Sequence, residues 1–189
     1  MRPWQDIIGS GFTVPDFEAY CAALNWSTWR PNFIVVHNTA TPSLKQRPNG
    51  FQPHHMDNLV HYYRDEKGWS AGPHLFVDDH LIWVFTPLTV RGVHSPSWNM
   101  ASWGVEMLGD YDKEDFENGR GSEVQENAVA AVAILSLTLG LDPETIRFHG
   151  EDPKTTHRNC PGQNVQKDAF VDAVSTWIAQ DENGEHSID

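Results

Sequence analysis

The chain has 189 residues, of which 39% are hydrophobic, so it is long enough to form one domain with its own core. Thirteen Lys and Arg residues against 26 Asp and Glu residues give a formal net charge of −13, which argues against a nucleic-acid or anionic-membrane partner held by phosphate neutralisation. Ten histidines beside only two cysteines favour a metal enzyme over a disulfide scaffold, and such a composition suits a reducing compartment.

The first ten residues contain no apolar run long enough for the core of a signal peptide. No stretch approaches the roughly 18 apolar residues that span a membrane, and the nearest, Ala128 to Leu139, fits a buried helix better. We therefore expect a protein that is made in the cytoplasm without a signal peptide and does not insert into a membrane.

Two elements are predicted in the N-terminal part. A helix start is indicated by Thr13-Val-Pro-Asp16, with Pro15 in the first turn. The apolar residues that follow at helical spacing are Phe17, Tyr20, Cys21 and Leu24, so Cys21 is expected on a packed face. The β-branched run Phe33-Ile-Val-Val36 then predicts a short buried strand that ends at His37. This histidine should face a site at the strand end.

The middle of the chain predicts a second helix and three strands. The helix begins at Pro53, and its apolar stripe comprises Met56, Leu59, Val60 and Tyr63. Strands are predicted at residues 74–77 and 81–85, joined by a tight turn, and at residues 102–108. In the last of these, Glu106 lies on the face with small neighbours, opposite an apolar face.

The C-terminal part predicts two helices and one more strand. The sequence Ser122-Glu-Val-Gln125 resembles a capping box that opens a buried helix, which Gly140 ends. A short strand at residues 145–148 ends at His149, and a polar loop runs to Gly162. A final amphipathic helix is expected from about Asn164 to Ala179.

Strands that alternate with helices, without an internal repeat or a dividing linker, predict one α/β domain. We expect this domain to span residues 1–180, followed by an acidic C-terminal tail at residues 181–189.

Three side chains form a candidate metal site. His37 and His149 each end an apolar strand, and Cys160 precedes Pro161-Gly162, whose rigid turn would fix the direction of the thiol. Catalytic zinc takes three such protein ligands and keeps a fourth position open. The spacing alone also allows scattered surface histidines and a buried thiol.

Four sequence blocks carry a family resemblance that covers roughly residues 32–165. They are Phe33-Ile-Val-Val-His-Asn-Thr-Ala40, Gly68-Trp-Ser-Ala-Gly-Pro-His-Leu-Phe-Val77, Val93-His-Ser-Pro-Ser-Trp-Asn99 running on to Ser102-Trp-Gly-Val-Glu-Met-Leu-Gly109, and Phe148-His149 with Cys160-Pro-Gly162. Together and in this order they resemble the zinc-dependent N-acetylmuramoyl-L-alanine amidases of the type 2 family, which includes bacteriophage lysozyme-like amidases and animal peptidoglycan recognition proteins. The resemblance implies a central mixed β-sheet flanked by helices.

The resemblance also implies a ligand set for one zinc ion: His37, His149 and Cys160. The gap between His149 and Cys160 is longer than in short family members, and His157 lies within it. His157 is therefore an alternative ligand, or a loop residue near the substrate, although a loop insertion at residues 151–154 favours His149.

Catalytic roles follow from the same comparison. Glu106 matches the glutamate that some members use as general base, against the alternative of a structural salt bridge. Many members have a tyrosine before the histidine of the second block, where this chain has Pro73, and this shifts the weight to Glu106. Arg158 stands where many members have a lysine that stabilises the oxyanion, and it is the second catalytic candidate.

His94 and Asn99 match the block that lines the substrate, so we predict that they contact it, with His157; a strand-capping role is the alternative for the first two. The implied activity is cleavage of the amide between N-acetylmuramic acid and L-alanine of peptidoglycan by a monomer.

The biological setting that we favour is a phage endolysin that reaches the cell wall through a holin-type pore. The alternatives are a non-catalytic peptidoglycan-binding module and a cytoplasmic amidase that recycles soluble muropeptides.

Overall fold

The computed structural model describes residues 3–183 of the chain. At its centre is a six-stranded mixed sheet with the order β1-β4-β3-β5-β2-β6. The strands are β1 (Ser10–Phe12), β2 (Phe33–Asn38), β3 (Leu75–Val77), β4 (Ile82–Val84), β5 (Ser102–Met107) and β6 (Arg147–Phe148). Strands β3, β5, β2 and β6 run parallel to one another, whereas β4 is antiparallel to β3 and to β1.

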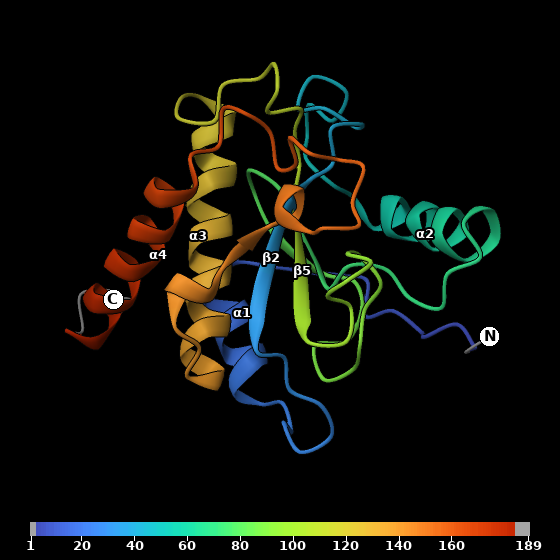
Figure 1. The fold of residues 1–189 in the computed structure, drawn as a ribbon, viewed down its shortest axis with the longest axis horizontal. Helices are drawn as coiled ribbons and strands as arrows, with labels where there is room; N and C mark the ends of the chain where they lie inside the picture. Colours follow the sequence, from blue (N-terminus) through green and yellow to red (C-terminus); the bar gives the residue numbers. More distant parts are fainter. Residues whose placement is uncertain (1–2, 184–189) are drawn as a thin grey trace.

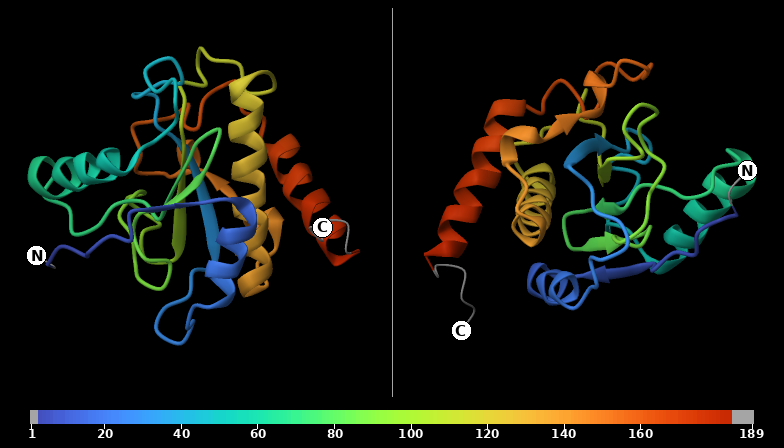
Figure 2. Two further views of the ribbon diagram at one scale, coloured as in Figure 1. Left: turned by 180° about the vertical axis from the view of Figure 1, so that it is seen from behind. Right: turned by 60° about the horizontal axis from the view of Figure 1, so that its bottom comes forward.

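The helices lie on both faces of this sheet. Helix α3 (Arg120–Leu139) covers one face, with α1 (Val14–Ala22) and α4 (Lys167–Glu182) packed beside it (Figure 1). Helix α2 (Pro53–His61) lies on the opposite side of the sheet, as the two views in Figure 2 show, and continues into a π-helical turn, η1 (Tyr62–Glu66). Two 3-10 turns complete the structure, η2 (Pro143–Thr145) and η3 (His149–Glu151). The alternating elements of the sequence predict an α/β domain, and the mixed sheet flanked by helices is the fold that the family resemblance implies.

The two central strands divide their side chains between the core and a polar face. Side chains alternate along a strand, and residues in register on neighbouring strands share a face. One set, Ile34, Val36, Trp103 and Val105, belongs to the hydrophobic core. The other face carries His37 and Glu106, which are register partners on β2 and β5.

Several local predictions are confirmed. Thr13 caps α1 because its hydroxyl oxygen accepts a hydrogen bond from the Asp16 amide at 3.4 Å. Cys21 is 1% exposed on the packed face of α1. Gly140 ends α3 in the left-handed region, with φ of 65°.

The predicted capping box at Ser122 is wrong, because α3 already begins at Arg120. The reason is tertiary: the Arg120 guanidinium donates to the Asp79 carboxylate at 2.6 and 2.8 Å, and also to the Leu44 carbonyl at 2.7 Å. The Ser122 hydroxyl, now inside the helix, donates to the Gly119 carbonyl at 2.8 Å instead of capping the helix.

Three other boundaries differ from expectation. Strand β1 has no predicted counterpart, and the strand expected at residues 145–148 forms only at residues 147–148, as β6, because Thr145 belongs to η2. Helix α4 begins at Lys167, later than expected, because the Asn164 side chain donates to the Glu114 carbonyl at 2.9 Å and holds this stretch as a loop. The helix then runs through Glu182, and residues 184–189 of the predicted tail lie outside the described residues.

Among residues 3–183, no helix has the length and apolar character needed to cross a bilayer.

Candidate metal centre

The candidate site lies where the parallel strands end. His37 is the penultimate residue of β2, Glu106 is its register partner on β5, and His149 directly follows β6. The carboxyl ends of parallel strands meet at one edge of a sheet, and binding sites form there in many α/β domains. The topology thus collects residues that are far apart in the sequence.

Three of the predicted ligands converge. One ligand atom from each of His37, His149 and Cys160 lies within 4.8 Å of the other two. A tetrahedral zinc ion with bonds of about 2.0 to 2.3 Å holds its ligand atoms roughly 3.3 to 3.8 Å apart, so these three atoms lie within about 1 to 1.5 Å of the separation that one ion needs. His157 is not part of this group, and its exposed ring lies 5.8 Å from the ring of His149.

The chemistry of this group fits a zinc ion. Nε2 of His149 is buried and has no hydrogen-bond partner among the described residues. A buried polar atom without a partner costs free energy, and a metal ion bound to this imidazole would explain why the protein keeps it there. Burial, and secondarily the Glu106 carboxylate, raises the pKa of the Cys160 thiol, while a hydrogen bond from the Asn38 backbone opposes this. A cation held beside the thiol would favour the thiolate that zinc prefers.

Glu106 is a carboxylate without a salt bridge to lysine or arginine among the described residues. Its Oε1 lies 3.9 Å from Nδ1 of His37, and its side chain is 15% exposed to solvent. Burial raises the pKa of Glu106 to about 8. The structural salt bridge considered from the sequence is therefore not formed with lysine or arginine, and the carboxyl group can change its protonation state near neutral pH.

His94 takes a place that the sequence did not indicate. Its ring is 6% exposed, and its Nδ1 lies 3.0 Å from Nε2 of His37. His94 lines the cavities described next, so its predicted contact with substrate stays a prediction. Both of its ring nitrogens, however, already have partners within the protein.

Two adjoining cavities open at the site. The larger, of about 560 Å³, is bordered by His37, His149, Cys160 and Glu106, and by aromatic side chains from the other wall. The smaller, of about 390 Å³, is lined on one side by residues 93–96 and Asn99, and on the other by residues 154–157. Trp69, His94, His149 and His157 border both cavities. The two cavities together offer a continuous surface to an extended ligand.

Tyr63 is a site residue that the sequence reasoning missed. Its helical spacing from Met56 and Leu59 indicates only a buried stripe, yet it borders the larger cavity from the π-helical turn η1. Its ring stacks on Trp69, with centroids 5.2 Å apart, and is 8% exposed. Burial, together with the charge of Glu106, holds the pKa of Tyr63 well above its usual value. The phenol is therefore a proton-bearing group facing the same cavity as Glu106.

Two predicted site residues are engaged elsewhere. The exposed Arg158 donates to the carbonyls of Asp152 at 3.0 Å and Pro153 at 3.2 Å, and it is not among the residues that line either cavity. Asn99 lines the smaller cavity, but its Oδ1 accepts hydrogen bonds from the amides of His94 and Ser95, both at 2.7 Å. Its side chain thus caps the loop that carries His94.

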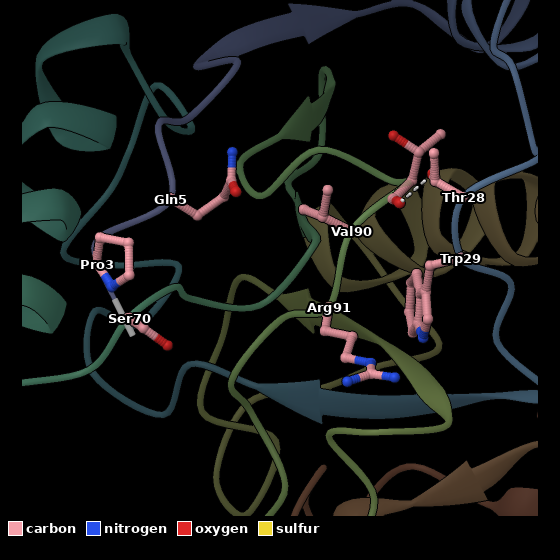
Figure 3. A pocket seen from close by; sticks show the side chains of 8 residues that line it. Pro3, Gln5, Thr28, Trp29, Ser70, Val90 and Arg91 are labelled. Carbon is pink, nitrogen blue, oxygen red and sulfur yellow. Dashed lines mark hydrogen bonds between the residues drawn. The ribbon is translucent and has the colours of Figure 1, made fainter. Parts of the chain in front are cut away.

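A third cavity, of about 290 Å³, lies away from this centre (Figure 3). Pro3, Gln5 and Ser70 stand on one side of it, and Thr28 and Trp29 on the other. Arg91 is the charged residue of its lining, which shares no residue with the two cavities above. The lining of this third cavity therefore contains no cluster of metal-ligating or proton-transferring side chains.

The fold and this site define an α/β domain in which three side chains that could hold a metal ion lie beside the carboxyl group of Glu106. The chain matches the family model of N-acetylmuramoyl-L-alanine amidases over residues 27–163. Because this match spans well over half of the chain, the protein belongs to the N-acetylmuramoyl-L-alanine amidase family.

Individual relatives agree with this family. Peptidoglycan-recognition protein 1 of Holotrichia diomphalia is 25% identical over 109 residues, which are 57% of this chain and 54% of that protein. The chain thus spans about half the length of this curated relative.

Solved structures show the same fold. The endolysin amidase LysCS from Clostridium intestinale superposes with a TM-score of 0.60 at 21% identity, over 80% of this chain and 91% of that one. Wild-type PGRP-LB of Drosophila superposes with a TM-score of 0.60 at 17% identity, over 93% and 88% of the two chains.

Proposed function

We propose that this protein is a zinc-dependent N-acetylmuramoyl-L-alanine amidase, which hydrolyses the amide between N-acetylmuramic acid and L-alanine in peptidoglycan. The observation that carries the proposal is the convergence of His37, His149 and Cys160 within 4.8 Å, with the Glu106 carboxylate 3.9 Å from His37, at the wall of one cavity. Family membership supports the substrate class.

His37, His149 and Cys160 would hold the ion and leave a fourth position open. Zinc bound there would polarise the amide carbonyl and lower the pKa of water toward about 7. Glu106 would accept the proton of the attacking water and pass it to the leaving amine of L-alanine. Burial raises the pKa of this carboxyl group to about 8 without a metal, and a zinc ion nearby would lower it, so that the deprotonated form needed to accept the proton is populated near neutral pH.

Tyr63 and the cavity walls would position the substrate. A phenol that keeps its proton can donate a hydrogen bond to the carbonyl oxygen as negative charge develops there. The stacked pair Tyr63 and Trp69 offers an aromatic wall for the sugar or the stem peptide. His157, Asn99 and His94 border the smaller cavity, where the far end of the substrate would lie. Arg158 keeps its proposed role at the oxyanion only if its side chain leaves the loop carbonyls.

Purified protein should release L-alanine amino termini from intact sacculi when zinc is present, and His37→Ala should abolish both zinc binding and this release. Activity on soluble muropeptides alone would favour a recycling amidase over an endolysin. Zinc-independent binding to sacculi without any release of amino termini would contradict the enzymatic proposal and favour a binding module.

A phage endolysin is the setting that we propose for this activity. The endolysin amidase with the same fold supports it. The test is lysis of bacteria from without after the outer permeability barrier has been removed, and failure to lyse any such cells while soluble muropeptides are cleaved would contradict it.

A further inference from the structure

His94 is a buried histidine to which the proposed reaction gives no chemical step. Its ring is 6% exposed and makes polar contacts on both sides. Nδ1 lies 3.0 Å from Nε2 of His37, and Nε2 lies 3.2 Å from the carbonyl oxygen of Ser102. A side chain whose two ring nitrogens are both bound within the protein is arranged to orient a neighbour.

The hydrogen bonds determine which nitrogen of His94 carries its proton. A backbone carbonyl only accepts, so Nε2 of His94 must donate to Ser102. The Ser102 hydroxyl, 3.5 Å away, cannot supply a proton instead, because it donates to the Trp98 carbonyl at 2.7 Å. A neutral imidazole has one N–H group, and burial disfavours the charged form, so Nδ1 of His94 is left as an acceptor.

The same reasoning determines the tautomer of His37. Since Nδ1 of His94 accepts, Nε2 of His37 must be the donor across the 3.0 Å contact. Nδ1 of His37 then carries the free lone pair, on the edge of the ring that lies 3.9 Å from Glu106. We infer that His94 is a positioning residue, which holds His37 in the Nε2–H tautomer and thereby presents the Nδ1 lone pair to the metal ion. This inference rests on the metal site of the proposed function.

The surroundings of His94 are built to hold this ring. Gly104 lies under it on β5, and a Cβ atom at this position would stand 2.4 Å from Cγ of His94, so a larger residue would displace the imidazole. Asn99 fixes the backbone of the same residue by accepting from its amide at 2.7 Å. The ring is thus constrained from the strand below and from its own loop.

His74 provides a matched comparison. It is equally buried and lies beside His94, with ring centroids 5.8 Å apart. Its Nδ1 accepts from the Gly104 amide at 3.1 Å and its Nε2 donates to the Val90 carbonyl at 3.0 Å, so both ring nitrogens bind backbone. It has no hydrogen bond to His37, and its loss should leave the tautomer of His37 unchanged.

The direct test is the tautomer of His37 in the metal-free, unmodified protein, measured by long-range ¹H–¹⁵N NMR of the histidine rings. The expected result is a proton on Nε2 and a bare Nδ1. A proton on Nδ1 of His37 would overturn the inference, whether or not the protein binds zinc. This readout depends on neither activity nor metal, so it separates the inference from the proposed function.

The second test is the zinc affinity of variants, measured by competition with a chromogenic chelator. His94→Leu removes the acceptor and should weaken zinc binding about 10- to 100-fold, the usual cost of losing the partner of a ligand histidine. His94→Asn, which keeps an acceptor oxygen near the position of Nδ1, should recover most of the affinity. His74→Leu is the control and should bind zinc as the unmodified protein does.

If His94→Leu does not fold, Gly104→Ala tests the same point by displacing the ring, and it should also weaken zinc binding and mix the His37 tautomers. Unchanged affinity in a folded His94→Leu protein would overturn the inference while leaving the metal site intact. No zinc binding by the unmodified protein would instead overturn the proposed function.

Discussion

His37 and Glu106 are register partners on adjacent parallel strands, and Nδ1 of the histidine lies 3.9 Å from Oε1 of the glutamate. Partners in register point to the same face, so the sheet itself holds the proposed metal ligand beside the proposed base. This placement does not depend on a loop, and rigid elements position such groups more precisely than loops do.

Glu106→Gln should separate metal binding from proton transfer. Glutamine keeps the shape of the side chain but cannot accept a proton from water, so turnover should fall about 10²- to 10⁴-fold. The three ligands are untouched, and zinc content measured by mass spectrometry should therefore stay at one ion per chain. A variant with the full rate of amide hydrolysis would show that another residue is the base.

Zinc should stabilise the folded protein through Cys160. A ligand that binds only the folded state adds about 2.7 kcal/mol at 100 times its dissociation constant. The melting temperature of the chelator-treated protein should therefore rise when zinc is added, and Cys160→Ser should lose most of this rise. Cys21→Ala is the control, because Cys21 is buried in α1 and belongs to no metal-ligand group among the described residues. An equal rise in the Cys160→Ser protein would argue against this ligand.

Tyr63→Phe should slow the reaction without weakening the fold. No hydrogen bond to the Tyr63 hydroxyl is found within residues 3–183, so its removal should change the free energy of unfolding by about 0.5 kcal/mol or less. Loss of a donor to the developing oxyanion should lower kcat about 10- to 100-fold. Tyr62→Phe, at a residue that borders the same cavity but is 39% exposed, should keep the normal kcat. Equal kcat values for both variants would remove Tyr63 from the mechanism.

Asp152 should make the stability of the metal-free protein depend on pH. Burial alone would raise the pKa of this fully buried carboxyl group, but hydrogen bonds from Ser95, Ser97 and the Lys154 amide lower it well below its usual range. A carboxyl group with a depressed folded-state pKa stabilises the protein above its unfolded pKa of about 3.9, and this contribution is lost as the pH falls through the folded-state value.

Asp152→Asn should therefore cost about 1 to 3 kcal/mol at pH 7, measured by urea unfolding with chelator present, and much less at acidic pH. Asp172→Asn, at an exposed position of α4, is the control and should change stability little at any pH. A constant difference between the Asp152→Asn and unmodified proteins from pH 7 to pH 3 would contradict the assignment.

The sequence alone indicated most of the helices and strands and the candidate ligands, but not β1 or the start of α3. The run from Phe33 to Val36 is β-branched and apolar, which predicts strand β2, and the alternation around Glu106 predicts β5. The histidines at the ends of β2 and β6 could be singled out because polar residues that follow buried strands stand at a sheet edge. These are local signals, since each depends on residues close to one another in the chain.

Only the tertiary structure decided how these residues are used. The sequence predicted a substrate contact for His94, and this stays a prediction; only the fold of its loop over Gly104 places its ring 3.0 Å from His37. Tyr63 looked like a core residue until the π-helical turn brought it to the cavity.

The start of α3 was set in the same way, by an ion pair between Arg120 and Asp79 that no local pattern contains. Periodicity reports which face of an element is buried, because burial repeats with the geometry of that element. It carries no information on which side chains from distant segments meet, because strand register and loop packing determine those contacts.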